Sequence, residues 1–327
     1  MWDFSLSSTL NIMFKTMPFI LLRMAVFFGI TVAYIAVTGV GAGVGFGVGN
    51  IFGDTDGGGG IGAVWGGLFG FGAVSLAVYW IREYILYVVK AGHIAVMVRL
   101  IDGQDIPSGK NQFSYGKEIV TARFAETNVL FGLDQIIKGI IRVITGLVGG
   151  VGMLLPIPGV QGLLSFVNSV IRMSLTYVDE VVLGYNMRID SQNPYETAQD
   201  GLVLYAQNAK PMIKNAIWLS IFLWVLSFLV FLLMLAPAGA ILYLYPGELG
   251  GWSFVLAIVF ALALKAALLE PFAIAALMSV YFKKIEGQTP NPEWRAKLAG
   301  ASDKFVELKD KALGYVSGDS QNTTQVR

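Results

Sequence analysis

Long apolar stretches alternate with short polar gaps along this chain of 327 residues. A helix of about 20 apolar residues is long enough to cross the hydrocarbon core of a bilayer. The stretches near or above this length are 19–51, 61–89, 136–155, 159–183, 213–236 and 252–282. Because hydrophobic residues make up 55% of the chain, a soluble core cannot absorb all of these stretches. The pattern predicts an all-α, polytopic membrane protein with about six transmembrane helices and additional cytoplasmic amphipathic helices.

The Lys and Arg residues lie in alternate gaps, and such a bias sets the orientation of a membrane protein. Three gaps contain no Lys or Arg, namely 52–60, 156–158 and 237–251. This asymmetry predicts a multi-pass protein of the plasma (inner) membrane with both termini in the cytoplasm. The first apolar stretch is too long for a cleaved signal peptide, so we expect it to be an uncleaved anchor.

Turn residues and charges divide the chain into six expected segments. The first, 1–101, is a glycine-rich transmembrane hairpin whose second helix continues past the membrane, and that helix either projects into the cytoplasm or bends near Gly92. A cytoplasmic loop and amphipathic helix follow at 102–135, and then a transmembrane hairpin at 136–188 that spans fully or is re-entrant. A cytoplasmic amphipathic segment at 189–212 precedes a third transmembrane hairpin at 213–282. The last segment, 283–327, is a cytoplasmic amphipathic helix with a tail that we expect to be disordered from residue 314.

Glycine recurs at every fourth position in the first hairpin, a spacing that lets two helix backbones approach closely in lipid. The three ladders are Gly39, Gly43 and Gly47; Gly41, Gly45 and Gly49; and, on the second helix, Gly62, Gly66 and Gly70. In one interpretation these glycines only pack the two helices of the hairpin together. In the other, the second ladder of the first helix contacts another subunit or lines a narrow pore.

Reactive side chains are scarce. The chain has no Cys, and His93 is its one histidine. The absence of Cys excludes a thiolate nucleophile and a Cys-ligated metal site, and a single His excludes a His cluster. The glycines at 57, 59 and 62 match a dinucleotide fingerprint by spacing, but the fingerprint requires a strand before it and a βαβ unit around it. We expect no enzyme activity, no catalytic residue, no cofactor and no bound metal.

Ionisable residues inside the apolar stretches are more informative, because a charge at mid-membrane is costly and normally faces protein or water. Lys265 lies near the middle of the last stretch, with Glu270 five residues later. Pro271 follows and is expected to kink the helix. The polar residues of 159–183 that can face them are Gln161, Asn168, Arg172, Asp179 and Glu180. These groups either form a network that only fixes packing or line a hydrated path.

A layout in the second half of the chain resembles that of choline-transporter-like membrane proteins. The residues that carry the resemblance are 177–186 (YVDEVVLGYN), 193–201 (NPYETAQDG), 269–272 (LEPF) and 282–287 (FKKIEG). The resemblance implies a helix that leads into a short cytoplasmic amphipathic helix, two spanning helices and a charged exit. Those proteins have more spanning helices and a large external loop, so no substrate or site follows for this chain.

Three classes of function remain. The charged groups of the spanning stretches and the glycine ladders favour an oligomeric channel or transporter for a small solute or ion. The amphipathic segments favour a non-catalytic membrane scaffold or assembly partner, and they also suit a lipid-handling protein. The net charge of +1 indicates no particular partner. We expect membrane lipids, further copies of the chain and another membrane protein as partners, and no nucleic acid.

Overall fold

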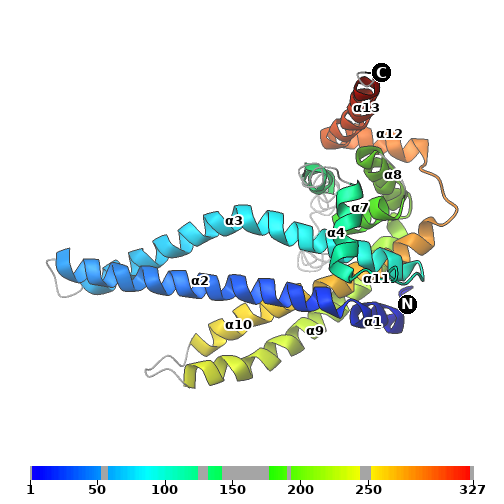
Figure 1. The fold of residues 1–327 in the computed structure, drawn as a ribbon. Helices are drawn as coiled ribbons and strands as arrows, with labels where there is room; N and C mark the ends of the chain where they lie inside the picture. Colours follow the sequence, from blue (N-terminus) through cyan, green and yellow to red (C-terminus); the bar gives the residue numbers. More distant parts are fainter. Residues whose placement is uncertain are drawn as a thin grey trace, which may run out of the picture. The chain divides into compact units, whose positions relative to one another are not determined.

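The computed structural model describes residues 2–52, 58–123, 132–141, 177–189, 193–243 and 252–324. Every regular element in these residues is a helix (Figure 1), which confirms the all-α fold class. The chain divides into two compact units. Unit 1 comprises Met1–Phe19, Lys90–Leu226 and Glu270–Arg327, and unit 2 comprises Ile20–Val89 and Ser227–Leu269.

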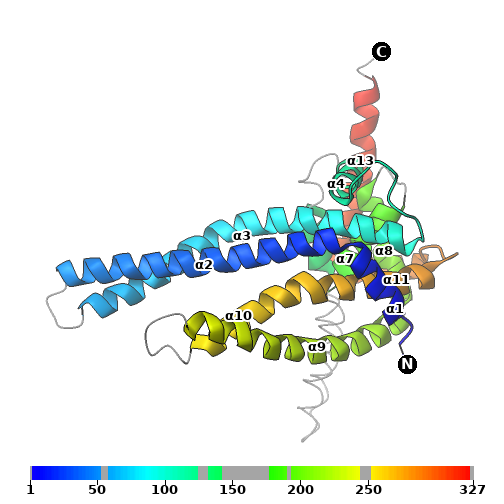
Figure 2. The ribbon, with the colours of Figure 1, turned by 60° about the horizontal axis from the view of Figure 1, so that its bottom comes forward.

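Unit 2 contains the long apolar helices. They are most of α2 (Met17–Phe52), the first two thirds of α3 (Gly58–Ile101), the second half of α9 (Ala209–Tyr243), α10 (Trp252–Leu264) and the π-helical turn η1 (Lys265–Leu269). Within this unit α2 and α3 lie side by side (Figures 1 and 2). The ring of Phe231 on α9 meets that of Phe254 on α10, with their centroids 5.4 Å apart.

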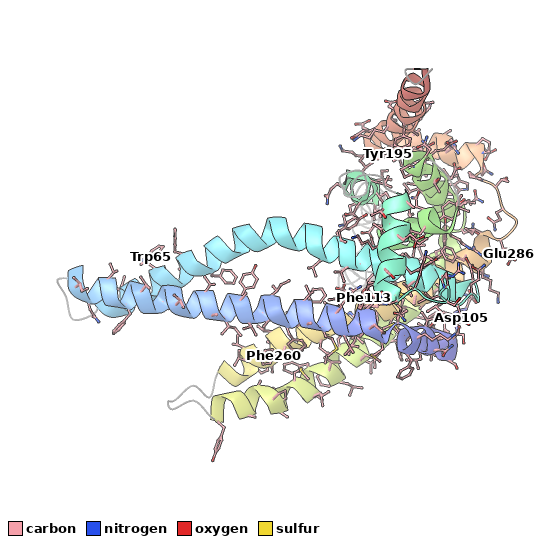
Figure 3. The ribbon with its side chains drawn as sticks, in the orientation of Figure 1. Trp65, Asp105, Phe113, Tyr195, Phe260 and Glu286 are labelled. Carbon is pink, nitrogen blue, oxygen red and sulfur yellow. The ribbon has the colours of Figure 1, made fainter. Side chains whose placement is uncertain are left out.

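Among the residues that the structure describes, three helical segments are long and apolar enough to cross a membrane: Met17–Val48, Ala209–Ala240 and Phe254–Ile285. They correspond to the first, fifth and sixth stretches of the sequence pattern, and Gly60–Gly72 in the second stretch forms a shorter apolar helix. Large apolar side chains point outward from these helices, as with Trp65, which is 68% exposed (Figure 3). Residues 142–176, which hold most of the third and fourth stretches, lie outside the described residues. A membrane protein is therefore supported, while the number of six spans stays a prediction.

Directly before Pro271, where we expect a kink, lies η1, the π-helical turn that joins α10 to α11 (Glu270–Ile285), and the kink itself stays a prediction. Proline has no N–H, so a carbonyl about one turn before it loses its helical donor. The guanidinium of Arg23, which is buried, donates from Nη2 to the Ala266 carbonyl at 3.0 Å. A buried Arg on α2 thus satisfies a carbonyl in the turn that precedes the proline.

Unit 1 is built from shorter helices around the buried end of α3. They are α1 (Leu6–Lys15), α4 (Gln112–Arg123), a helix at 132–141, α7 (Val178–Arg188), α8 (Pro194–Gln207), the start of α9, α11, α12 (Pro292–Ala301) and α13 (Asp303–Thr324). α7 packs against α8 and α11, and α8 packs against α12 and α13. Tyr281 on α11, which is fully buried, donates its hydroxyl to the Gly201 carbonyl of α8 at 2.9 Å.

The structure continues α13 to Thr324, into the tail that we expect to be disordered from residue 314, and that expectation stays a prediction. Phe305, Leu308 and Ala312 are buried on one side of α13, and the Asn193 side chain donates to the Ala312 carbonyl at 2.9 Å. A helix that tertiary contacts hold at its start extends at little further cost, because nucleation is the unfavourable step. The local polarity of the last residues contained no sign of this.

The helix α7 begins inside the fourth apolar stretch, 159–183. Tyr177 is a turn residue, and α7 begins at Val178 with Asp179 and Glu180 in its first turn. Acidic residues are stabilised at a helix N-terminus by the helix dipole, which favours a start at this point. Asp179 and Glu180 therefore belong to α7 in unit 1, and α7 is not one of the three apolar spans.

Candidate functional site: a buried charge cluster in unit 1

Five ionisable side chains from three helices meet inside unit 1, and we name them the charge cluster. They are Lys90 on α3, Asp134 and Lys138 on the helix at 132–141, and Asp179 and Glu180 on α7. Local sequence explains part of the arrangement. Asp134 and Lys138 are four residues apart and so share one helix face, and the two acids of α7 occupy its N-terminal turn.

The cluster is connected by close contacts. The Lys90 ammonium pairs with Oε1 of Glu180. Nζ of Lys138 lies 2.6 Å from Oδ2 of Asp134 and 4.0 Å from Oδ2 of Asp179. The side chains of Asp179 and Glu180 are hydrogen-bonded to each other. The three acidic residues are each at most 7% exposed, so water screens these charges poorly.

The charges of the cluster do not cancel. Three carboxylates face two ammonium groups, so full ionisation would leave one uncompensated negative charge away from water. Burial raises the pKa of Asp179 well above its ordinary value, and the adjacent Glu180 charge raises it further. A protonated Asp179 balances the charge of the cluster and can donate its hydrogen to Glu180.

The pKa values of the other residues in the cluster are shifted as well. Burial alone would raise the pKa of Glu180, but the Lys90 ammonium and the hydrogen bond from Asp179 outweigh it and lower that pKa to about 2. Burial alone would lower the pKa of Lys90, but the charges of Glu180, Asp179 and Glu270 outweigh it and raise that pKa. Burial also raises the pKa of Asp134, and Lys138 offsets only part of this effect. The arrangement can therefore hold one exchangeable proton between fixed charges.

The residues proposed from the sequence fall in several places. Asp179 and Glu180 come together in the charge cluster, and Glu270 at the start of α11 acts electrostatically on Lys90 of that cluster. Lys265 belongs to η1 in unit 2, where it is half-buried. Among the described residues it has no hydrogen bond or ion pair. Asn168 and Arg172 lie outside the described residues, so the pairing of Lys265 with that stretch stays a prediction.

Sequence reasoning missed Lys90, Asp134 and Lys138 as site residues. Lys90 directly follows an apolar stretch, and its position along the chain indicates only the orientation of the helix. The spacing of Asp134 and Lys138 predicts a helical pair, but such pairs are common on solvated helix faces. The position of Asp134 and Lys138 is the signal that could have identified them, since this pair lies at the beginning of the long apolar stretch 136–155.

The glycine ladders are used unequally in unit 2. A Cβ atom at Gly45 would lie 1.9 Å from the Gly62 carbonyl oxygen, and one at Gly41 would lie 2.3 Å from that of Gly66. At Gly39, Gly43 and Gly47, by contrast, a Cβ atom would meet nothing within 4 Å. On Gly70 of α3 a Cβ atom would lie 2.7 Å from the Val37 carbonyl oxygen. The surroundings of Gly49 are outside the described residues.

The contacts at Gly41, Gly45, Gly66 and Gly70 show that α2 and α3 approach backbone to backbone through one ladder of α2. Within the described residues the ladder of Gly39, Gly43 and Gly47 is open. The contact of α3 with the ladder that contains Gly41 and Gly45 accounts for one of the two neighbours expected for α2. A second neighbour, at the other ladder, stays a prediction.

The described part of the chain contains no group of three or more His, Asp or Glu side chains arranged to hold a metal ion. Comparison of the chain with known protein families, with curated proteins and with solved structures gave no match. The resemblance to choline-transporter-like proteins is not tested by these comparisons. A functional conclusion therefore rests on the membrane-length helices and on the charge cluster.

Proposed function

We propose that this protein is a six-span membrane channel or transporter for a small solute or ion, and that the charge cluster takes part in transport. Both termini lie in the cytoplasm of a plasma-membrane protein in this proposal, and several copies assemble. The observation that carries the proposal is the excess of carboxylates over ammonium groups in the buried cluster of Lys90, Asp134, Lys138, Asp179 and Glu180.

The energetic cost of the cluster supports a functional role. Buried ion pairs often contribute no more to stability than apolar side chains of the same size, because desolvation cancels the attraction. A cluster that only fixed packing would also gain nothing from an unbalanced carboxylate. In proteins that conduct protons and ions, buried Asp and Glu residues mark the path. The site can gain and lose a proton at Asp179 while the pair of Lys90 and Glu180 holds its geometry.

Lys265, Glu270, Asn168 and Arg172 enter the proposal as further groups along the path. Glu270 extends the negative field that acts on Lys90. The π-helical turn at Lys265 supports the idea as well, because π-helical insertions in α-helices are frequent at functional sites.

The test is ion flux into liposomes that contain the purified full chain. Fluxes of H⁺, Na⁺, K⁺ and Cl⁻ are compared for wild type, Glu180→Gln, Lys90→Met and the double variant Lys90→Met with Glu180→Leu. We expect the wild type to conduct at least one of these ions and all three variants to lose most of that flux. Each single variant leaves a buried charge without its partner and should lose about 3–5 kcal/mol of stability, whereas the double variant should recover part of it.

The matched control is the exposed ion pair of Lys110 and Glu118 on the same unit. Lys110→Met and Glu118→Gln should leave the flux unchanged and alter stability by less than about 1 kcal/mol. A double variant of the cluster that conducts as well as wild type would assign the cluster to packing alone. A wild type that conducts none of the four ions would overturn the transport proposal and favour the membrane scaffold or the lipid-handling protein.

A further inference from the structure

The N-terminal helix α1 has three distinct sides, although the sequence pattern did not predict a helix there. Its N-cap is Ser5, whose hydroxyl accepts a hydrogen bond from the Ser8 amide. Thr9, Ile12 and Met13 are buried, and α1 packs against α11 within unit 1. The remaining circumference is exposed and is itself divided between apolar and polar residues.

The exposed apolar side carries Leu10 and Phe14, which are 47% and 68% exposed. They are four residues apart and so lie one above the other on the helix. Ser8, Asn11 and Lys15 are also exposed and form the adjacent polar side. A short helix with a buried side, an exposed apolar side and an exposed polar side suits a boundary between hydrocarbon and water.

Two tryptophans independently indicate where the boundary between hydrocarbon and water lies along unit 1. The ring of Trp2 contacts that of Trp218 on α9, with centroids 5.7 Å apart in an edge-on arrangement. Both rings are about 40% exposed. Trp residues gather at the membrane–water interface, where the indole has one apolar and one polar environment. Trp2 therefore lies beside a Trp that stands near the beginning of a candidate span.

The charged residue near the start of α9 also indicates that the membrane–water interface lies near Trp218. Lys214, one turn before Trp218, lies 2.9 Å from Asp3, so the charged end of α9 and the start of the chain lie together. Beyond Trp218, Ile221 and Val225 are exposed apolar residues of the same unit, as expected for a surface that faces lipid. The exposed apolar side of α1 is thus attached to the charged end of a lipid-facing helix.

We infer that α1 lies in the headgroup region of the bilayer, with Leu10 and Phe14 immersed in the acyl chains and with Trp2 and Trp218 at the interface. The occupant of this exposed apolar side is the phospholipid bilayer rather than a second protein. The helix anchors unit 1 at the membrane surface and sets the depth at which α9 enters. This inference requires membrane residence but does not depend on transport.

The test uses single cysteines, because the chain has none of its own. The full-length variants Leu10→Cys, Phe14→Cys, Ser8→Cys and Asn11→Cys are labelled with a nitroxide and placed in liposomes of phosphatidylcholine and phosphatidylglycerol. Power-saturation electron paramagnetic resonance compares collisions of each label with oxygen, which enters lipid, and with a nickel chelate, which stays in water. All four positions are exposed, so the label should not disturb the packing of unit 1.

We expect the labels at 10 and 14 to collide more with oxygen than with nickel, at a depth of about 5–10 Å below the headgroup boundary. The labels at 8 and 11 should show the reverse ratio. Equal, nickel-dominated collisions at all four positions would place α1 in water and overturn the inference. Low collision rates with both reagents at 10 and 14, together with dipolar broadening between labels, would assign this side to a second copy of the chain and would also overturn it.

Discussion

Asp179 and Glu180 are neighbours in the first turn of α7, yet their carboxyl groups respond to the site in opposite directions. The pKa of Asp179 is raised by burial and by the charge beside it, and the pKa of Glu180 is lowered to about 2 chiefly by Lys90 against the effect of burial. At this scale the physical cause is position: Glu180 contacts the ammonium of Lys90, while Asp179 lies 4.0 Å from Lys138, which is already paired with Asp134.

A pH dependence of stability follows from these directions. A carboxyl group whose pKa is raised on folding binds more protons in the folded state, so stability falls as pH rises above its ordinary value. Asp179 and Asp134 both act in this sense, and so does Asp200 of the Arg295 pair, since burial raises its pKa as well. Glu180 adds no slope between about pH 5 and pH 8, because it is ionised in both states there.

We therefore predict that the free energy of unfolding of the purified protein, measured by denaturant titration, falls from about pH 5 to about pH 8. Asp179→Asn should make this fall shallower by up to about 1.4 kcal/mol per pH unit. The control is Glu307→Gln on α13, where hydrogen bonding to Lys304 lowers the pKa despite a small effect of burial, so its titration lies on the acid side of this range. An unchanged slope in Asp179→Asn would mean that Asp179 is ionised in the folded protein.

At the scale of elements, the two ladders of α2 have opposite surroundings on one helix. Gly45 faces the backbone of α3, and Gly43 faces open space among the described residues. Gly45→Ala forces the helices apart and should cost about 1–3 kcal/mol, as overpacking does. Gly43→Ala should instead stabilise the helix by up to about 1 kcal/mol, because alanine is the better helix former. Thermal unfolding in the same detergent compares the two variants directly.

The same position tests assembly. If copies of the chain pack through the open ladder, Gly43→Leu should lower the particle mass in mild detergent while leaving the hairpin intact, because leucine would hold two backbones apart. An unchanged mass for Gly43→Leu, with Gly45→Ala destabilised as expected, would restrict the ladders to the contact between α2 and α3 and remove the support for a homo-oligomer.

At the scale of the whole molecule, the six-span arrangement predicts a definite pattern of accessibility. Reporter fusions at Asp56 and Glu248, in gaps without Lys or Arg, should lie outside the cell, and fusions after Gly109 and Ser320 should lie inside. Three of the six spans are supported by long apolar helices. An external reporter after Gly109 would reverse the orientation of the first hairpin and would contradict the arrangement as a whole.

Membrane residence and the helical class follow from the sequence alone, because the length and composition of an apolar stretch are local properties. The same holds for helix starts such as Asn193 and Pro194, where one side chain caps the backbone and a proline follows. The sequence also located Asp179, Glu180 and Glu270 as unusual charges. It predicts that Asp179 and Glu180 can face Lys265, whose described surroundings contain no ion pair. Position along an apolar stretch does not determine which charge faces which.

Only the tertiary structure decided those partners. Lys90 and Glu180 are 90 positions apart, and no spacing rule joins residues on different helices at that separation. Tertiary packing likewise selected one of two equivalent glycine ladders for the contact with α3, and it buried Phe305, Leu308 and Ala312 of α13. The physical reason is common to all three: periodicity determines which side of a helix is apolar, but the neighbour on that side depends on the closure of the whole chain.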